Sequence, residues 1–306
     1  MDVAVLGAGP VGRDLAAVAA RAGHGVHLHD AEATAAMDAI DEVEHRFDEA
    51  AAAGDLTRDD RDAAVTRLDA TTGLEAAVAE AAVVVVTGRT DEHHLQETLA
   101  AVEEYVDRDT VLATMVPGGS VTVAAAGLRH PDRAIGLHVE DPADATVVEV
   151  VVPDQADEGT LARTEEFVEG LDMVPATVAD APGVVSTRLA LASEVEAMRL
   201  VADGVASVVD VDDAYARRYS HPMGPLERAD RAGLDRRLES LETLADALGE
   251  RFRPPAVLRD LVDAGHTGQA TGRGFYVWEN GEPSESALPD PAIVDRVAGP
   301  DDPAGD

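Results

Sequence analysis

One histidine and one glutamate are the residues of this chain best suited to acid–base chemistry. His138 stands at the end of a short apolar run, 134–137, and Glu149 lies inside the next apolar run, eleven residues later. Histidine is the side chain that titrates near neutral pH. A carboxylate that fixes the tautomer of the ring and stabilises its cation makes it a general base. The pair therefore predicts proton transfer, provided that the fold brings both side chains together.

A second candidate site lies near the N-terminus. There a strand-like run, 3–6, leads into a G-x-G-x-x-G motif, and an Ala- and Leu-rich helical stretch follows it. The first glycine permits a tight turn, the second lets the backbone approach a pyrophosphate, and the third lets helix and strand pack closely. The N-terminus of the helix offers free N–H groups to the phosphates. We expect the cofactor-binding residues here to be Gly7, Gly9, Pro10, Val11 and Gly12.

The next strand indicates which dinucleotide is bound. Residues 25–29 alternate like a strand and end at Asp30, 23 residues after Gly7. An acid at this place hydrogen-bonds the adenosine ribose hydroxyls and repels a 2′-phosphate. Glu32 follows, and no arginine lies close behind it. The pattern therefore predicts NAD rather than NADP as the cofactor.

The first 181 residues alternate between strand and helix patterns, which favours a doubly wound α/β sheet of the Rossmann type. Residues 82–86 form a run suited to a central parallel strand buried on both faces. Gly88 follows that run at the edge of the sheet where ligands bind, so it is a further candidate for contact with the cofactor. Strand-like runs at 110–113, 134–137, 147–152 and 173–177 continue the pattern.

After Ala181-Pro182-Gly183 the pattern becomes helical. We expect helices over 184–202, 210–219, 225–248 and 255–264, and a strand-like run only at 275–278. An α/β unit followed by an all-helical unit indicates two domains. The expected boundaries are a dinucleotide-binding domain at 1–181, a helical substrate and dimerisation domain at 182–280, and a loosely held acidic, Pro-containing tail at 281–306.

Composition narrows the class of protein. The 306 residues include 60 acids against 24 bases, a net charge of −36, and every base is an arginine. Acid spread along a globular chain is typical of a salt-adapted surface, and it argues against nucleic-acid binding, which needs cationic patches. There is no cysteine, no apolar run of about 20 residues and no signal-like start. We expect a cytoplasmic protein with no metal site and no membrane contact.

Five ordered segments resemble the 3-hydroxyacyl-CoA dehydrogenase family, from residue 3 to about residue 277. They are the glycine motif with Asp30; the His138 and Glu149 runs; the segment 182–188; the segment His221-Pro222-Met223-Gly224-Pro225-Leu226, with Asp230 and Gly233-Leu234-Asp235; and the segment 268–276. The last three open, mark and close the helical domain as they do in that family.

The resemblance implies hydride transfer from C3 of an (S)-3-hydroxyacyl-CoA to NAD, in fatty-acid metabolism, and a homodimer through the helical domain. His138 would take the hydroxyl proton, and Glu149 would hold and stabilise its charged form. The family carries a serine after the fourth expected strand, where this chain has Pro117 or Gly118, so Ser120 is the nearest hydroxyl. It carries an asparagine where this chain has Thr187. Ser120 and Thr187 are therefore the remaining catalytic candidates.

Two other hypotheses remain open. The same fold could oxidise another small 3-hydroxy acid or a sugar acid, because the replaced serine and asparagine are hydrogen-bond donors around the substrate. Alternatively, the chain could be a catalytically degenerate protein that binds NAD without turnover. The presence of His138 and Glu149 argues against the second alternative.

Overall fold

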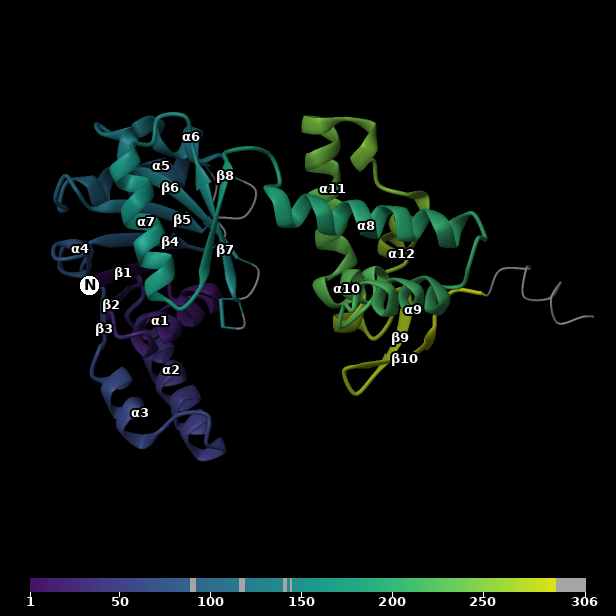
Figure 1. Ribbon diagram of the computed structural model, residues 1–306, viewed down its shortest axis with the longest axis horizontal. Coiled ribbons are helices and arrows are strands. Elements are labelled where there is room, and N and C mark those ends of the chain that lie inside the picture. The colour runs from purple at the N-terminus through teal and green to yellow at the C-terminus, as the bar shows by residue number, and fades with distance from the viewer. Residues whose placement is uncertain (89–91, 116–118, 140–141, 144, 290–306) are drawn as a thin grey trace, which may run out of the picture. The chain divides into compact units, whose positions relative to one another are not determined.

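A computed structural model describes residues 1–88, 92–115, 119–139, 142–143 and 145–289. The chain forms two compact units, Met1–Val184 and Val185–Asp306. The first unit is an α/β domain and the second is mainly helical, which confirms the predicted fold class (Figure 1).

The described part of the first unit contains one twisted sheet of eight strands, in the order β3-β2-β1-β4-β5-β6-β7-β8. The first six strands are parallel; β7 runs antiparallel to β6, and β8 runs parallel to β7. The bounds are β1 (Asp2–Leu6), β2 (Gly25–His29), β3 (Leu68–Thr71), β4 (Val83–Thr87), β5 (Val111–Met115), β6 (Ala134–His138), β7 (Val147–Val152) and β8 (Val174–Ala179).

Helices cover both faces of this sheet, because the central strands are apolar on both sides. One face packs against α1 (Pro10–Arg21), α2 (Ala33–Ala53), α3 (Arg58–Val65) and α7 (Glu158–Gly170). The other face packs against α4 (Leu74–Val78), α5 (Glu92–Glu103) and α6 (Val121–Ala124). The strand order reverses between β1 and β4, and in such sheets the ligand crevice lies outside the carboxyl ends of the strands at that switch point.

The second unit contains five α-helices in its described residues, and their buried faces form a core of its own. They are α8 (Val185–Ala202), α9 (Val208–Tyr219), α10 (Pro225–Ala232), α11 (Leu234–Leu248) and α12 (Ala256–Asp263). The single helix expected over 225–248 is wrong, since the chain breaks at Gly233, whose φ is +96°. A periodic apolar pattern continues through an isolated glycine, so the sequence alone did not reveal the break.

A two-stranded hairpin, β9 (Tyr276–Glu279) and β10 (Glu282–Ser286), is added to the helices of the second unit. Asn280 and Gly281 connect the strands with φ values of +53° and +84°, as a tight hairpin turn requires. The expected tail from residue 281 therefore begins with a strand. Residues 290–306 lie outside the described residues.

Candidate active site

The loop after β1 is closely packed at its first and last glycines, Gly7 and Gly12, and open at the middle one, Gly9. Gly7 has a φ of +115°, which a side chain rarely tolerates. A Cβ on Gly12 would lie 1.9 Å from the carbonyl oxygen of Gly7, so only glycine fits there. A Cβ on Gly9 would have no neighbour within 4 Å. The open side of the loop is therefore at Gly9, where the sequence motif predicts a pyrophosphate.

The N-terminus of α1 is suited to an anion. Gly9 is its N-cap residue and Pro10 its first residue, and no side chain caps this end. The first turn contains no acidic residue, so no carboxylate there neutralises the positive end of the helix dipole. Val11 and Gly12 lie in that first turn. The uncapped end can bind the phosphates of a dinucleotide.

Asp30 directly follows β2 and lies beside the glycine loop. One of its carboxylate oxygens accepts a hydrogen bond from the backbone N–H of Ala8 at 3.0 Å, and the other accepts one from that of Glu32 at 3.0 Å. Each oxygen keeps acceptor capacity for a hydroxyl group. The loop and the acid thus form one unit that fits a pyrophosphate and an adenosine ribose. Gly88, which follows β4, is open on its Cβ side.

His138 and Glu149 are direct cross-strand neighbours. They are register partners in the antiparallel pair β6–β7, so both side chains point to the same face of the sheet. Cβ atoms of such partners lie about 4.5–5.5 Å apart. Glu149 is buried, with 6% of its surface exposed, whereas His138 is partly exposed at the end of its strand. This arrangement can hold a histidine in one orientation and stabilise its cation.

Ser120 caps α6 and faces an acid. Its hydroxyl donates to a carboxylate oxygen of Asp180 at 2.8 Å and accepts from the backbone N–H of Val123 at 3.3 Å. The N–H and hydroxyl of Thr122 donate to the same oxygen of Asp180. These hydrogen bonds outweigh burial and lower the pKa of Asp180. The single proton of Ser120 is therefore directed to Asp180 in this structure.

The other predicted residues fall elsewhere. Thr187 lies in the first turn of α8, in the second unit, and is partly exposed. Pro117 and Gly118, where the family resemblance would place a serine, lie outside the described residues. The first unit therefore brings together His138 and Glu149 in one place and the glycine loop with Asp30 in another.

Sequence reasoning did not identify Thr87 and Asp180 as residues that support these sites. Thr87, at the end of β4, donates to the carbonyl oxygens of Leu6 and Gly7. Asp180, just after β8, holds the start of α6. Both act on segments that are 58 or more residues away in the sequence. A threonine at the carboxyl end of a strand beside the switch point was the one available signal for Thr87.

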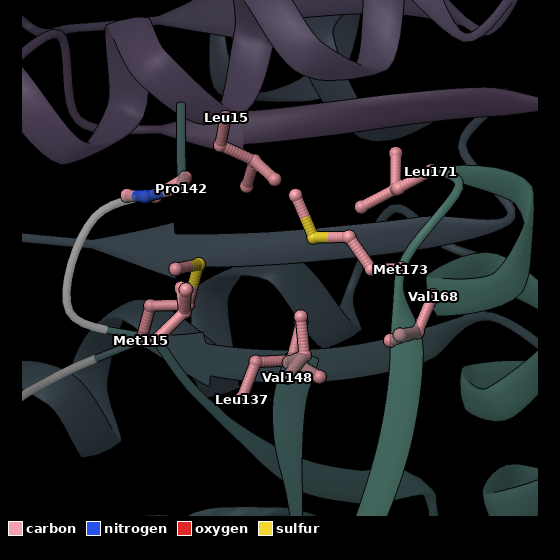
Figure 2. Close-up of a pocket in the computed structure, with 9 residues that line it drawn as sticks. Leu15, Met115, Leu137, Pro142, Val148, Val168, Leu171 and Met173 are labelled. Carbon is pink, nitrogen blue, oxygen red and sulfur yellow. The ribbon is translucent and has the colours of Figure 1, made fainter. Parts of the chain in front are cut away.

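A small apolar hollow lies on the opposite side of β6 from His138. Leu137 projects into it, and alternate residues of a strand point to opposite faces (Figure 2). Every described residue that lines the hollow is apolar, so the hollow belongs to the core. Its lining residues are Leu15, Met115, Leu137, Val139, Pro142, Val148, Val168, Leu171 and Met173.

Two buried carboxylates organise the second unit. Asp230 accepts from the backbone N–H groups of Phe275 and Tyr276 and from the indole N–H of Trp278, each at 2.9 Å. Asp212 accepts from the hydroxyl of Tyr276 at 3.0 Å. Burial raises the pKa of both acids. These bonds join α10, which contains Asp230, to the segment that ends at Tyr276.

Two kinds of site are not found among the described residues. No group of three or more His, Asp or Glu side chains is arranged to hold a metal ion there. No helix in the same ranges is long and apolar enough to cross a membrane.

Comparisons with known proteins agree along nearly the whole chain. The family model for the 3-hydroxyacyl-CoA dehydrogenase NAD-binding domain matches residues 2–181, and the model for the C-terminal domain of the same family matches residues 183–278. The 3-hydroxybutyryl-CoA dehydrogenase of Mycobacterium tuberculosis is 35% identical over 286 residues, which cover 90% of this chain and 98% of that protein.

Two further similarities concern function and fold. The 3-hydroxyadipyl-CoA dehydrogenase of Escherichia coli is 32% identical over 287 residues, which cover 90% of this chain and 58% of that protein. The crystal structure of (S)-3-hydroxybutyryl-CoA dehydrogenase from Ralstonia eutropha has a TM-score of 0.86 and 28% identity, and the match covers 91% of this chain and 99% of that one.

Proposed function

The chain belongs to the 3-hydroxyacyl-CoA dehydrogenase family, and we propose that it oxidises an (S)-3-hydroxyacyl-CoA to the 3-oxoacyl-CoA with NAD. The observation that carries this proposal is the pairing of His138 with Glu149 across β6 and β7, in the sheet that also carries the glycine loop. Relatives named for 3-hydroxybutyryl-CoA favour a short acyl chain.

In the proposed reaction NAD supplies the hydride acceptor for C3 of the substrate. His138 takes the proton from the C3 hydroxyl oxygen onto a ring nitrogen as the C–H bond breaks. Glu149 orients the ring and stabilises the imidazolium that forms. In the reverse direction, the protonated ring donates to the ketone oxygen.

The glycine loop and Asp30 determine which cofactor serves this reaction. The uncapped start of α1 would bind the pyrophosphate, and Asp30 would accept from the ribose hydroxyls. The charge of Asp30, with Glu32 close behind it, repels a 2′-phosphate. Gly7 and Gly12 would allow the close packing of the loop, and Gly9 would let the backbone approach the pyrophosphate.

The reverse reaction provides the test. Purified protein in molar KCl is mixed with NADH and acetoacetyl-CoA, and the loss of NADH absorbance is followed. We expect turnover in the wild type and a loss of at least about 10²-fold in His138→Ala. His130→Ala is the matched control, because His130 is an exposed loop histidine of the same unit. Equal turnover in wild type and His138→Ala would contradict the mechanism.

Two alternatives give different results in the same assay. Activity on a free 3-hydroxy acid but on no CoA ester would indicate another substrate of the same fold. Tight NADH binding without turnover on any of these compounds would indicate a degenerate NAD-binding protein. The hydrogen bond from the Ser120 hydroxyl to Asp180 is compatible with this last alternative, whereas the His138–Glu149 pair opposes it.

Three further aspects complete the proposal. The net charge of −36 indicates a salt-adapted protein, so the melting temperature should rise between 0.1 and 2 M KCl. NAD and acyl-CoA esters are held inside cells, which favours a cytoplasmic location, and cell fractionation would test it.

Exposed apolar side chains on α8 and α9 favour a homodimer through the helical unit, and sedimentation showing only monomers in high salt would exclude it. The exposed apolar side chains on these two helices are Val185, Leu189, Val209 and Tyr219.

A further inference from the structure

We propose that Thr87 is a positioning residue for the cofactor, whose hydroxyl holds the glycine loop in the shape that binds the pyrophosphate. Thr87 ends β4, the strand next to β1 at the switch point of the sheet. Leu6 and Val86 are register partners, so Thr87 stands beside Gly7, the first residue of the loop. The inference rests on the NAD binding of the proposed function.

The Thr87 hydroxyl binds the backbone on which the loop turns. Its oxygen lies 3.2 Å from the carbonyl oxygen of Leu6 and 3.1 Å from that of Gly7. One proton serves both acceptors, which belong to the peptide groups before and after the α-carbon of Gly7. Only 8% of the Thr87 surface is exposed, so water cannot easily replace this donor.

The same hydroxyl occupies the space that a side chain on the first or the third glycine would need. A Cβ on Gly7 would lie 2.8 Å from the Thr87 hydroxyl oxygen, and a Cβ on Gly12 would lie 2.9 Å from it. The carbonyl oxygen of Gly7 accepts from Thr87 while it packs against Gly12. Thr87 thus fixes the first and third glycines relative to each other, which leaves the side of the loop at Gly9 open to the phosphates.

Replacement by valine is the decisive change, because valine has the shape of threonine without the hydroxyl. In Thr87→Val, a methyl group would face two carbonyl oxygens and would donate to neither. The loop would then lose part of its preformed shape, and binding would have to restore it. We expect the Kd for NADH to rise about two- to tenfold, the effect of one lost hydrogen bond. Thr87→Ser, which keeps the donor, should bind NADH as the wild type does.

Thr110 provides a matched control in the same sheet. It is 4% exposed, and its hydroxyl donates to the carbonyl oxygen of Ala81 at 3.0 Å. It precedes β5, at the edge of the parallel strands opposite to Thr87. Thr110→Val therefore removes a similar buried bond far from the glycine loop. Any effect that comes only from lower stability should appear equally in this variant.

The experiment is a fluorescence titration of the full chain with NADH in molar KCl, with melting temperatures measured in parallel. Support requires a raised Kd in Thr87→Val and wild-type Kd values in Thr87→Ser and Thr110→Val. A wild-type Kd in Thr87→Val, or an equal rise of the Kd in Thr110→Val, would overturn the positioning role of Thr87 but leave the NAD assignment intact. Failure of the wild type itself to bind NADH would overturn the cofactor assignment as well. If Thr87→Val does not fold, Thr87→Ala provides the same comparison.

Discussion

Alanine substitutions at Gly9 and Gly12 should have opposite effects on stability, although the two glycines belong to one motif. Gly9 has φ −70° and ψ 179°, a conformation that alanine adopts freely, and its Cβ would have no neighbour within 4 Å. At a compatible site, Gly→Ala stabilises a protein by about 0.4–1 kcal/mol, because it restricts the unfolded chain. The melting temperature of Gly9→Ala should therefore stay level or rise by up to about 4 °C.

Gly12→Ala should instead destabilise the first unit. Its Cβ would lie 1.9 Å from the carbonyl oxygen of Gly7 and 2.9 Å from the Thr87 hydroxyl, so the loop and α1 would have to separate. Overpacking against backbone costs about 3 kcal/mol at the upper end of the usual range. For a unit of this size, that energy corresponds to a fall of about 6–12 °C in melting temperature.

NADH binding distinguishes the two causes. The methyl group of Gly9→Ala would project into the open side of the loop, where the backbone must approach the pyrophosphate, so the Kd should rise at least about tenfold in a fully folded protein. Gly12→Ala should lose binding together with stability. Thermal melting and fluorescence titration in the same buffer measure both quantities. A wild-type Kd in Gly9→Ala, or a wild-type melting temperature in Gly12→Ala, would refute this account of the loop.

Three other predictions concern acidic residues. Glu149→Gln should lower kcat about 10²–10⁴-fold with little change in the Kd for NADH, and an unchanged kcat would exclude a role beside His138. Asp30→Ala should shift the preference toward NADPH in parallel titrations, and an unchanged ratio of Kd values would remove it as the cofactor selector. Glu103→Gln should cost about 3–5 kcal/mol near neutral pH, since it leaves the buried Arg133 without its carboxylate at 3.1 Å. Hydrogen bonds outweigh burial and lower the pKa of Glu103, so its contribution to the free energy of unfolding is present above its ordinary pKa of 4.5 and is lost as the pH falls. Below that pH the free energy of unfolding, measured with urea, should therefore fall more steeply for the wild type than for the variant.

What the sequence predicted well depends on residues that are close together in the chain. The glycine motif lies between its own strand and helix, and the fold class followed from it and from the alternating pattern. The NAD cofactor followed from the same motif together with Asp30, at the end of the next strand-like run. The short edge strand β3, Leu-Asp-Ala-Thr, escaped because it is only half buried and carries no continuous apolar run. The β9–β10 hairpin had its signal in Asn280-Gly281, but the polar residues of β10 resemble a tail.

What the sequence could not predict depends on contacts between distant segments. Thr87 reaches Gly7 across 80 residues, and Asp180 reaches Ser120 across 60. No local spacing encodes such pairs, because strand order and register create them. The helix break at Gly233 is of the same kind, since Asp230, in the turn before it, is engaged by the distant backbone of Phe275 and Tyr276.

The direction of the Ser120 proton has a consequence for the proposed chemistry. Alcohol oxidation needs a base at the start and a donor to the carbonyl oxygen at the end. With the Ser120 proton directed to Asp180, the described residues of the first unit leave the donor role to the histidine that has just been protonated. Glu149 then acts at both stages: it orients the neutral His138 ring that takes the proton, and it stabilises the positively charged ring that donates to the carbonyl oxygen. The reaction therefore depends on the β6–β7 pair more than on any hydroxyl of α6, and Ser120 serves to hold the start of that helix to Asp180.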